Sequence, residues 1–176
     1  KKLFDALEQR GLLENTLVVL VGDHGEGFGQ HGRQQHDAVI YEEGLRIPMV
    51  LIGPGVKPGS TVKGLRQLID IAPTVTDMLG FEGDRSFFGK DLIRSDGHEE
   101  LFASCHYKDY CNALIGQRYK YVDHFDRSPS EVYDLLKDPL EKHALDASAQ
   151  SKAGLDPRNA RAKMRRLRSA TNSMYD

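Results

Sequence analysis

Cysteine is scarce in this sequence of 176 residues, which contains only Cys105 and Cys111. Two cysteines are too few for the disulfide scaffold that holds many small secreted domains together. Their spacing also matches no metal-binding motif, so we expect both to be ordinary thiols. A chain of this length does not depend on cross-links, because it can bury the core of one ordinary domain.

A net positive charge and long hydrophobic runs are lacking as well. The formal net charge is −2 at pH 7, which argues against nucleic acid as the main partner because phosphate binding needs a positive field. No apolar stretch approaches the length of a membrane-spanning helix. No signal peptide is recognisable, but the chain begins with Lys1 rather than with methionine, and we expect it to be a piece of a longer protein.

An acid and an imidazole follow directly on a strongly hydrophobic segment. Residues 16–21 are β-branched or apolar at every position, which is typical of a strand buried on both faces. Asp23 and His24 come immediately after this segment, next to two glycines. In open α/β sheets, ligands bind outside the carboxyl ends of the strands. We therefore expect Asp23 and His24 to lie where catalysis or metal binding takes place.

The first part of the chain has the pattern of an α/β domain. Residues 3–12 have helical spacing of apolar side chains, and residues 47–52 predict a second buried strand. Asp70 is expected to cap a further helix that ends before Gly80. A helix followed by a buried strand is the second half of a βαβ unit. We therefore expect a partial, mainly parallel sheet with flanking helices.

The second part of the chain has a different pattern. Short strand candidates follow one another so closely that they can only form antiparallel hairpins or meanders; they are residues 101–103, 113–115, 119–122 and 132–135. The basic tail that begins after Asp156 is expected to be a solvated closing helix, although a basic helix could also bind an anionic surface. We divide the chain into residues 1–98, an α/β part, and residues 99–176, a small antiparallel sheet with its helix.

Several segments of this sequence, in order along the chain, resemble the sulfatase family of the alkaline phosphatase superfamily. They are residues 16–26, 29–32, 41–48, 70–80, 118–121 and 131–139. The resemblance covers most of the chain. It implies an alkaline-phosphatase-like fold and metal-dependent hydrolysis of sulfate esters.

The same resemblance shows what this chain does not contain. The nucleophile of the family is a cysteine or serine, converted to formylglycine, within a Cys/Ser-x-Pro-x-Arg motif near the N-terminus. A related branch uses a threonine or serine hydroxyl. The sulfatase motif and the early acidic metal ligands are absent here, and neither Cys105 nor Cys111 is followed by Pro-x-Arg. We therefore expect this chain to be the C-terminal portion of a sulfatase-like enzyme, which supplies part of the metal site but not the nucleophile.

The resemblance also implies roles for three residues. Asp23 and His24 match the paired metal ligands that follow the central strand of the family. His36 matches a position often held by a lysine that contacts the sulfate or phosphate and assists the leaving group. A histidine there can donate a proton near neutral pH. The nitrogen of His24 moves the metal preference away from calcium and toward manganese, zinc or iron, so we expect a divalent ion, Mn, Zn or Ca.

Two alternatives stay open. The Asp-His pair is also similar to the phosphonate monoesterase, lipoteichoic acid synthase and phosphoethanolamine transferase branches, so the substrate is a sulfate or a phosphate ester. The chain can also be a non-catalytic module, whose strand edges are covered by the missing N-terminal part of the same protein or by another chain. We expect the isolated chain to be inactive and to bind metal weakly. The resemblance implies a periplasmic, secreted or membrane-associated protein with an external catalytic domain.

Other conspicuous residues are expected to be structural. His31 lies close to Gly29 and next to Gly32, where it more plausibly holds the shape of a loop than touches a substrate. A structural charge network is expected at the entrance of the next strand, formed by Glu42, Glu43 and Arg46; such networks perturb charge without doing chemistry. Lys120 and Asp134, in the C-terminal strand candidates, are expected to be part of the scaffold.

Overall fold

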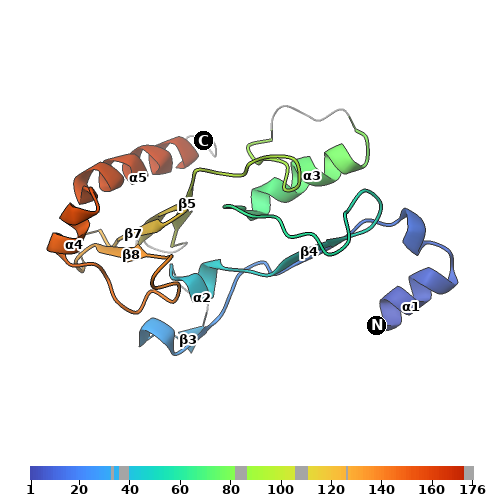
Figure 1. Cartoon of the computed structure of the whole chain (residues 1–176), viewed down its shortest axis with the longest axis horizontal. Helices are drawn as coiled ribbons and strands as arrows, with labels where there is room; N and C mark the ends of the chain where they lie inside the picture. Colours follow the sequence, from blue (N-terminus) through green and yellow to red (C-terminus); the bar gives the residue numbers. More distant parts are fainter. Residues whose placement is uncertain (33, 36–39, 82–86, 106–110, 126, 173–176) are drawn as a thin grey trace. The chain divides into compact units, whose positions relative to one another are not determined.

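The computed structural model describes residues 1–32, 34–35, 40–81, 87–105, 111–125 and 127–172 (Figure 1). It divides the chain into two compact units. Unit 1 comprises residues 1–23, 47–63 and 68–95, and unit 2 comprises residues 24–46, 64–67 and 96–176. The units alternate along the chain, and the domain boundary expected at residue 98 stays a prediction.

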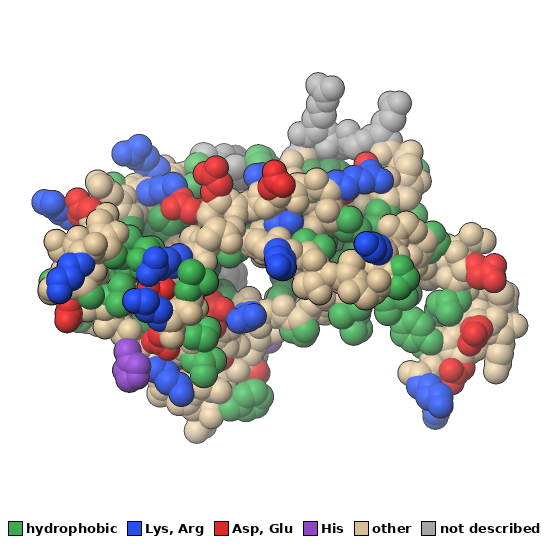
Figure 2. Space-filling view, in the orientation of Figure 1, with side chains coloured by type: hydrophobic (Ala, Val, Ile, Leu, Met, Phe, Trp, Pro, Cys, Tyr) green, Lys and Arg blue, Asp and Glu red, His purple; other side chains and the backbone are tan. Residues whose placement is uncertain are grey.

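Unit 1 is built around a two-stranded sheet. Its elements are α1 (Lys2–Gln9), the 3-10 helix η1 (Leu13–Asn15), β1 (Val18–Val21), β4 (Met49–Ile52), the 3-10 helix η3 (Leu68–Asp70) and α3 (Ile71–Met78). In the sheet, Val18 lies opposite Ile52 and Val21 opposite Met49. The facing pair Leu20 and Val50 is 66% and 45% exposed, and hydrophobic side chains are visible at the surface near β4 (Figure 2). Burial on both faces, expected for residues 16–21, is therefore not found within this chain.

The α/β class is confirmed, but the mainly parallel sheet is not found. Every strand pair among the described residues is antiparallel. A parallel pair needs a crossover connection that returns along the sheet, usually a helix. Between β1 and β4 the described elements are short, namely β2 (Gly27–Phe28), the 3-10 helix η2 (Gln30–Gly32), β3 (Gln34–Gln35) and α2 (Glu42–Leu45). None is long enough to carry the chain back along β1, so β4 runs in the opposite direction.

Helix α3 begins after Asp70 and ends before Gly80, as the sequence predicts; Asp70 occupies the N-cap position, but its side chain makes no capping hydrogen bond. Asp70 and Thr74 are fully buried. The Asp70 Oδ1 atom accepts a hydrogen bond from the backbone N–H of Lys90 (2.8 Å), and the Thr74 hydroxyl oxygen accepts one from the backbone N–H of Leu92 (2.7 Å). The two side chains thus bind residues 90–92 to the helix, and the Asp70 carboxylate is used for this contact rather than for a capping hydrogen bond.

Unit 2 contains the antiparallel sheet that the sequence predicts. Its strands, β5 (Glu100–Ser104), β6 (Asn112–Gly116), β7 (Tyr119–Asp123) and β8 (Glu131–Asp134), pair in sequence order. Helices α4 (Ala147–Lys152) and α5 (Pro157–Asn172) follow, and α5 lies along the sheet (Figure 1). Met164 of α5 is buried against Leu114, Tyr121 and Val132 of the sheet.

The basic helix α5 is the closing helix that the sequence predicts. Arg161 pairs with Asp123 of β7 at 3.0 Å, and Lys163 pairs with Glu100 of β5. Arg168 lies over the ring of Phe125, 5.0 Å from its centroid. No helix in the described part of the chain combines the length and the apolar character needed to cross a membrane.

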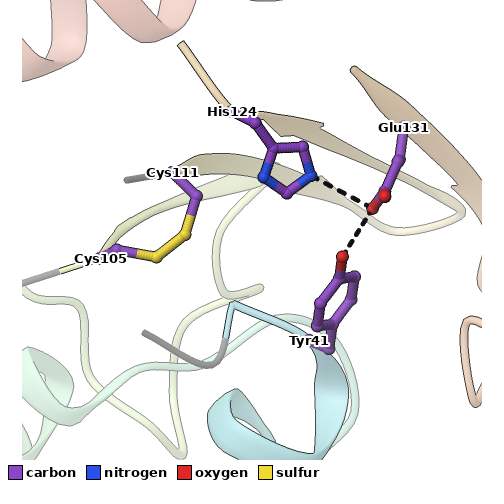
Figure 3. The surroundings of a disulfide bond; sticks show 5 residues. All are labelled: Tyr41, Cys105, Cys111, His124 and Glu131. Carbon is purple, nitrogen blue, oxygen red and sulfur yellow. Dashed lines mark hydrogen bonds and ion pairs between the residues drawn. A yellow bond between two sulfur atoms is a disulfide. The ribbon is translucent and has the colours of Figure 1, made fainter. Parts of the chain in front are cut away.

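Cys105 and Cys111 form a disulfide bond, with their Cα atoms 5.2 Å apart (Figure 3). The expectation of ordinary thiols is therefore wrong. The two residues extend the β5–β6 pair by one position beyond Ser104 and Asn112, and the Cys105 N–H donates to the Cys111 carbonyl at 2.9 Å. Facing positions of an antiparallel pair bring Cα atoms to the distance that a disulfide spans.

We expect Met164→Ala to lower the free energy of unfolding by about 2–5 kcal/mol, because it leaves a cavity between α5 and the sheet. Arg166→Ala, at an exposed position of the same helix, is the matched control and should stay within about 0.5 kcal/mol of the parent. Urea unfolding followed by circular dichroism measures both. Equal stability of the two variants would show that α5 does not contribute to the core.

Candidate functional site

Asp23 and His24 lie just beyond the carboxyl end of β1, where the chain bends into a loop. The N–H of Gly22 donates to the carbonyl of Pro48 at 3.2 Å, which ties the strand end to the start of β4. Both candidate ligands are exposed. Asp23 is the last residue of the first segment of unit 1, and His24 is the first residue of unit 2.

The contact of His24 with its neighbour fixes which ring nitrogen can bind a metal. The Nδ1 atom lies 2.8 Å from the carbonyl oxygen of Gly25. A carbonyl only accepts hydrogen bonds, so Nδ1 carries the hydrogen and the lone pair of the neutral ring is on Nε2. Metal-binding histidines commonly donate their other N–H in this way. In this tautomer, Nε2 is the His24 atom that a divalent cation would bind.

Gly25 holds the start of this loop against α2. Its N–H donates to the carbonyl of Gly44 at 2.9 Å. A Cβ atom at this position would lie 2.0 Å from the carbonyl oxygen of Glu43. Only glycine permits this close approach of two backbone segments, so the position of His24 depends on the residue that follows it.

No third ligand joins this pair within the described residues, where no group of three His, Cys, Asp or Glu side chains is placed to hold a metal ion. His36, the expected catalytic residue, lies outside the described residues. Its flanks are described: β3 comes just before it, and the buried Ile40 comes after it. The roles of Asp23, His24 and His36 therefore stay predictions.

His31 is held by its backbone conformation, by ring stacking and by two polar contacts. Its backbone has a φ of 50°, and its ring stacks on that of Tyr41 with centroids 3.8 Å apart. The Nδ1 atom lies 2.8 Å from Glu43 Oε1, and the Nε2 atom lies 2.8 Å from the carbonyl oxygen of Glu141. Burial alone would lower the pKa of His31, but the hydrogen bonds to Glu141 and Glu43 outweigh it and raise the pKa above its ordinary value. These contacts give His31 the structural role expected from the sequence.

A buried ion pair lies beside this histidine. The side chains of Lys120 and Glu141 are both fully buried, and Lys120 Nζ lies 2.7 Å from Glu141 Oε1. Lys120 Nζ also lies 3.4 Å from Glu42 Oε1, and the Glu42 N–H donates to Glu141 Oε2 at 2.6 Å. Burial raises the pKa of Glu141, while the adjacent ammonium of Lys120 opposes that rise.

Glu42 and Glu43 thus belong to a structural charge network, but their partners are Lys120 and His31 rather than Arg46. The buried Lys120 is part of the scaffold, as expected. Asp134 is paired with Arg118 at 2.8 Å. Among the described residues, no side-chain ion pair is recorded for Arg46. Glu141 could not be identified from the sequence, because no local pattern marks it and its partner in α2 lies 99 residues away along the chain.

A second cluster holds Tyr41 from the side of β8. The Oε2 atom of Glu131 accepts a hydrogen bond from the hydroxyl of Tyr41 (2.9 Å) and lies 3.5 Å from His124 Nε2 (Figure 3). It also accepts a hydrogen bond from the hydroxyl of Tyr133 (3.0 Å). Burial raises the pKa of the Tyr133 hydroxyl, which keeps it protonated as a donor. Sequence reasoning missed this cluster as well, since its members come from three separate segments.

Comparison with known proteins agrees with the resemblance seen in the sequence. Residues 1–81 match the family model described as Sulfatase. Arylsulfatase K of Bos taurus is 30% identical over 154 residues, which cover 77% of this chain and 28% of that protein. The chain belongs to the sulfatase family. It spans little more than a quarter of the length of this curated relative.

Solved structures share the fold of this sulfatase-family chain. A protein in complex with its substrate, D-glucosamine-2-N,6-O-disulfate, matches with a TM-score of 0.78 and 24% identity over 96% of this chain and 37% of that chain. The phosphonate monoester hydrolase of Silicibacter pomeroyi matches with a TM-score of 0.72 and 22% identity over 97% of this chain and 38% of that chain. These likenesses show the alkaline-phosphatase-like fold.

We expect Lys120→Met to lower the free energy of unfolding by about 3–5 kcal/mol at pH 7, because it leaves the Glu141 carboxylate buried without its cation. The loss should be smaller at pH 5 than at pH 8. Without Lys120, burial raises the pKa of the Glu141 carboxyl. At low pH the carboxyl is neutral and its burial costs little, whereas stability is lost as the pH rises through the raised pKa and the carboxyl ionises. Urea unfolding at the two pH values measures the difference.

Adding Glu141→Gln to Lys120→Met should recover part of the loss, since the amide oxygen still accepts the Glu42 N–H without a charge. Lys142→Met, at an exposed neighbouring position, is the control for the loss of a lysine. A double variant no more stable than Lys120→Met would contradict this account of the ion pair.

Proposed function

We propose that the protein containing this chain hydrolyses sulfate esters with the help of a divalent metal ion. Membership of the sulfatase family is the observation that carries the proposal, and the matched segment, residues 1–81, includes Asp23, His24 and His36. The curated relative reported above is itself a sulfatase by name. Because this chain spans a minor part of such proteins, the remainder of the protein is expected to supply the nucleophile and further metal ligands.

Asp23 and His24 are proposed as two ligands of the metal. A carboxylate suits hard cations, whereas an imidazole nitrogen favours manganese or zinc over calcium. The hydrogen bond from His24 Nδ1 to Gly25 supports Nε2 as the ligating atom. A bound divalent ion would neutralise charge on the ester oxygens and lower the pKa of the nucleophile.

His36 is proposed to contact the sulfate and to protonate the leaving oxygen. Its match to a family position often held by lysine supports a cationic role, and a histidine side chain can in general donate a proton near neutral pH. The described flanks of the segment lie in unit 2, where Ile40 is buried in the core cluster that also contains Tyr41 and Cys105. The C-terminal sheet is thus proposed as the support of this catalytic segment.

The apolar surface of the β1–β4 sheet supports a further part of the proposal. Leu20, Val50 and Ile52 are each more than 40% exposed, and an uncovered strand edge tends to pair. We propose that the N-terminal part of the same protein, or another chain, covers this sheet. The location of the protein outside the cytoplasm or facing the outside of a membrane stays a prediction.

Two other functions remain as alternatives. The Asp-His pair supports phosphodiester or phosphonate hydrolysis, or phosphoglycerol or phosphoethanolamine transfer, and the fold is shared with a phosphonate monoester hydrolase. The second alternative is a non-catalytic folded module. It is favoured by the finding that no three-ligand group is present among the described residues.

The test uses the full-length protein of which this chain is a part. We expect turnover of 4-nitrophenyl sulfate to exceed that of bis(4-nitrophenyl) phosphate and of a phenylphosphonate monoester. Asp23→Ala should lower kcat/KM by more than about 100-fold. Mutating even a residue that only hydrogen-bonds to a metal ligand typically lowers metal affinity or activity by about 10–100-fold. Asp5→Ala, an exposed acid on α1, is the matched control.

The 176-residue chain by itself should show no turnover and only weak metal binding by titration calorimetry. A protein that turns over the phosphate or phosphonate substrate and not the sulfate would replace the proposed function by the first alternative. Full activity of Asp23→Ala would remove Asp23 from the metal site.

We expect His36→Ala to lower kcat/KM for phenyl sulfate by about 10²–10⁴-fold, the usual contribution of a general acid. The loss should be smaller for 4-nitrophenyl sulfate, because its leaving group needs less protonation. His36→Lys should retain activity and extend it to higher pH, because a lysine side chain, with an ordinary pKa of about 10.4, stays protonated at a higher pH than histidine. The exposed His143→Ala is the control. Equal losses on the two substrates would exclude proton donation by His36.

A further inference from the structure

His31 contacts two hydrogen-bond acceptors at once. Its Nδ1 atom lies 2.8 Å from the Glu43 carboxylate, and its Nε2 atom lies 2.8 Å from the Glu141 carbonyl oxygen. A neutral imidazole has one N–H, whereas an imidazolium has two. A carbonyl cannot donate, and a carboxyl is far more acidic than an imidazolium in their reference states. Both contacts are therefore hydrogen bonds only when His31 is the imidazolium.

The surroundings of the ring favour this charge. The carboxylates of Glu43, Glu42 and Glu141 face the region, and the ammonium of Lys120 balances only part of their charge. The ring of Tyr41 is parallel to the imidazole within 8° at 3.8 Å, an arrangement in which an aromatic face stabilises a cation. The raised pKa of His31 agrees with the geometry.

The two hydrogen bonds join three separate segments of unit 2. His31 belongs to the loop between His24 and β3, Glu43 belongs to α2, and Glu141 lies in the segment after β8. The loop itself has little regular structure, since β2 and β3 are two residues long each. Its fixation must come from such tertiary contacts.

We propose that His31, held as an imidazolium, is a positioning residue of the proposed site: it fastens the loop that follows His24 to α2 and to the C-terminal segment at Glu141, and raising the pH releases it. The effect on catalysis rests on the proposed function, whereas the fastening itself does not.

The direction of the pH dependence follows from linkage. The folded-state pKa of His31 is raised above the ordinary value of 6.5. The stabilisation is therefore fully present below about pH 6.5 and is lost as the pH rises through the folded-state value. After deprotonation, one ring nitrogen directs a lone pair at Glu43 or at the Glu141 carbonyl, and that hydrogen bond is replaced by repulsion.

The fastening is tested on the 176-residue chain by amide hydrogen exchange, expressed as protection factors between pH 5.5 and 8.5. The amides of Gly25 and Gly32, which are hydrogen-bonded within unit 2, should lose roughly tenfold or more of their protection as the pH rises, as expected for the loss of a charged hydrogen bond. Amides of β6 should not change. Direct NMR titration of the His31 ring should give a midpoint above 6.5.

Two variants separate this mechanism from a general loss of structure. His31→Gln should remove the pH dependence and leave Gly32 at the low protection seen at high pH. Glu43→Gln keeps an acceptor for Nδ1 but removes a charge, so it should keep the protection at low pH and move the midpoint downward. His143→Gln, at an exposed histidine near Glu141, is the control and should behave as the parent. Protection that is independent of pH in the parent, or unchanged in His31→Gln, would overturn the fastening.

The positioning role is tested in the protein that turns over sulfate esters. His31→Gln should lower kcat at acidic pH with little change in KM and should flatten the pH profile, whereas Glu43→Gln should move the alkaline limb downward. Unchanged pH profiles would overturn the positioning role. A pH-dependent protection in a protein that turns over no sulfate ester would instead support the fastening and contradict the proposed function.

Discussion

The fully buried ammonium of Lys120 is the constraint on which the arrangement of unit 2 depends. A buried charge without a counter-ion is costly, so the fold has to bring Glu141 within 2.7 Å and Glu42 within 3.4 Å of the same nitrogen. These partners come from the segment after β8 and from α2. Any other docking of the two segments would leave a charge buried and unpaired. The pair therefore selects one arrangement, even where an apolar replacement would be equally stable.

Features encoded by neighbouring residues could be predicted from the sequence. The antiparallel sheet of the second part, the bounds of α3 and the closing helix follow from hydrophobic spacing and turn residues, which act within a few positions. The direction of β4, the disulfide between Cys105 and Cys111, and the use of Asp70 to hold residues 90–92 could not be predicted. Each depends on which distant segment becomes the neighbour, and a single sequence carries no direct signal of that pairing.

The candidate site shows the same division. The position of Asp23 and His24 after a hydrophobic strand marks them in the sequence, and the family resemblance gives them a role. The contact that sets the tautomer of His24 is local, since its acceptor is the next residue. Glu141 and Glu131 carry no such mark, although they hold His31 and Tyr41. Their roles arise only when the sheet and the loop are folded together.

The loop between β1 and β4 cannot keep its own shape, because helices of one turn and strands of two residues are not stable without support. Its support comes from tertiary contacts: Gly25 packs against the Glu43 and Gly44 backbone within the loop, the C-terminal segment holds His31, and β8 holds Tyr41. Two of these three supports belong to the C-terminal part of the chain. Residues of the C-terminal part therefore act, through His31 and Tyr41, on the loop that carries the proposed metal ligand His24. In the proposed active site, the charge and hydrogen bonding of Glu131 on β8 and of Glu141 in the segment after it would therefore set how firmly the loop is held.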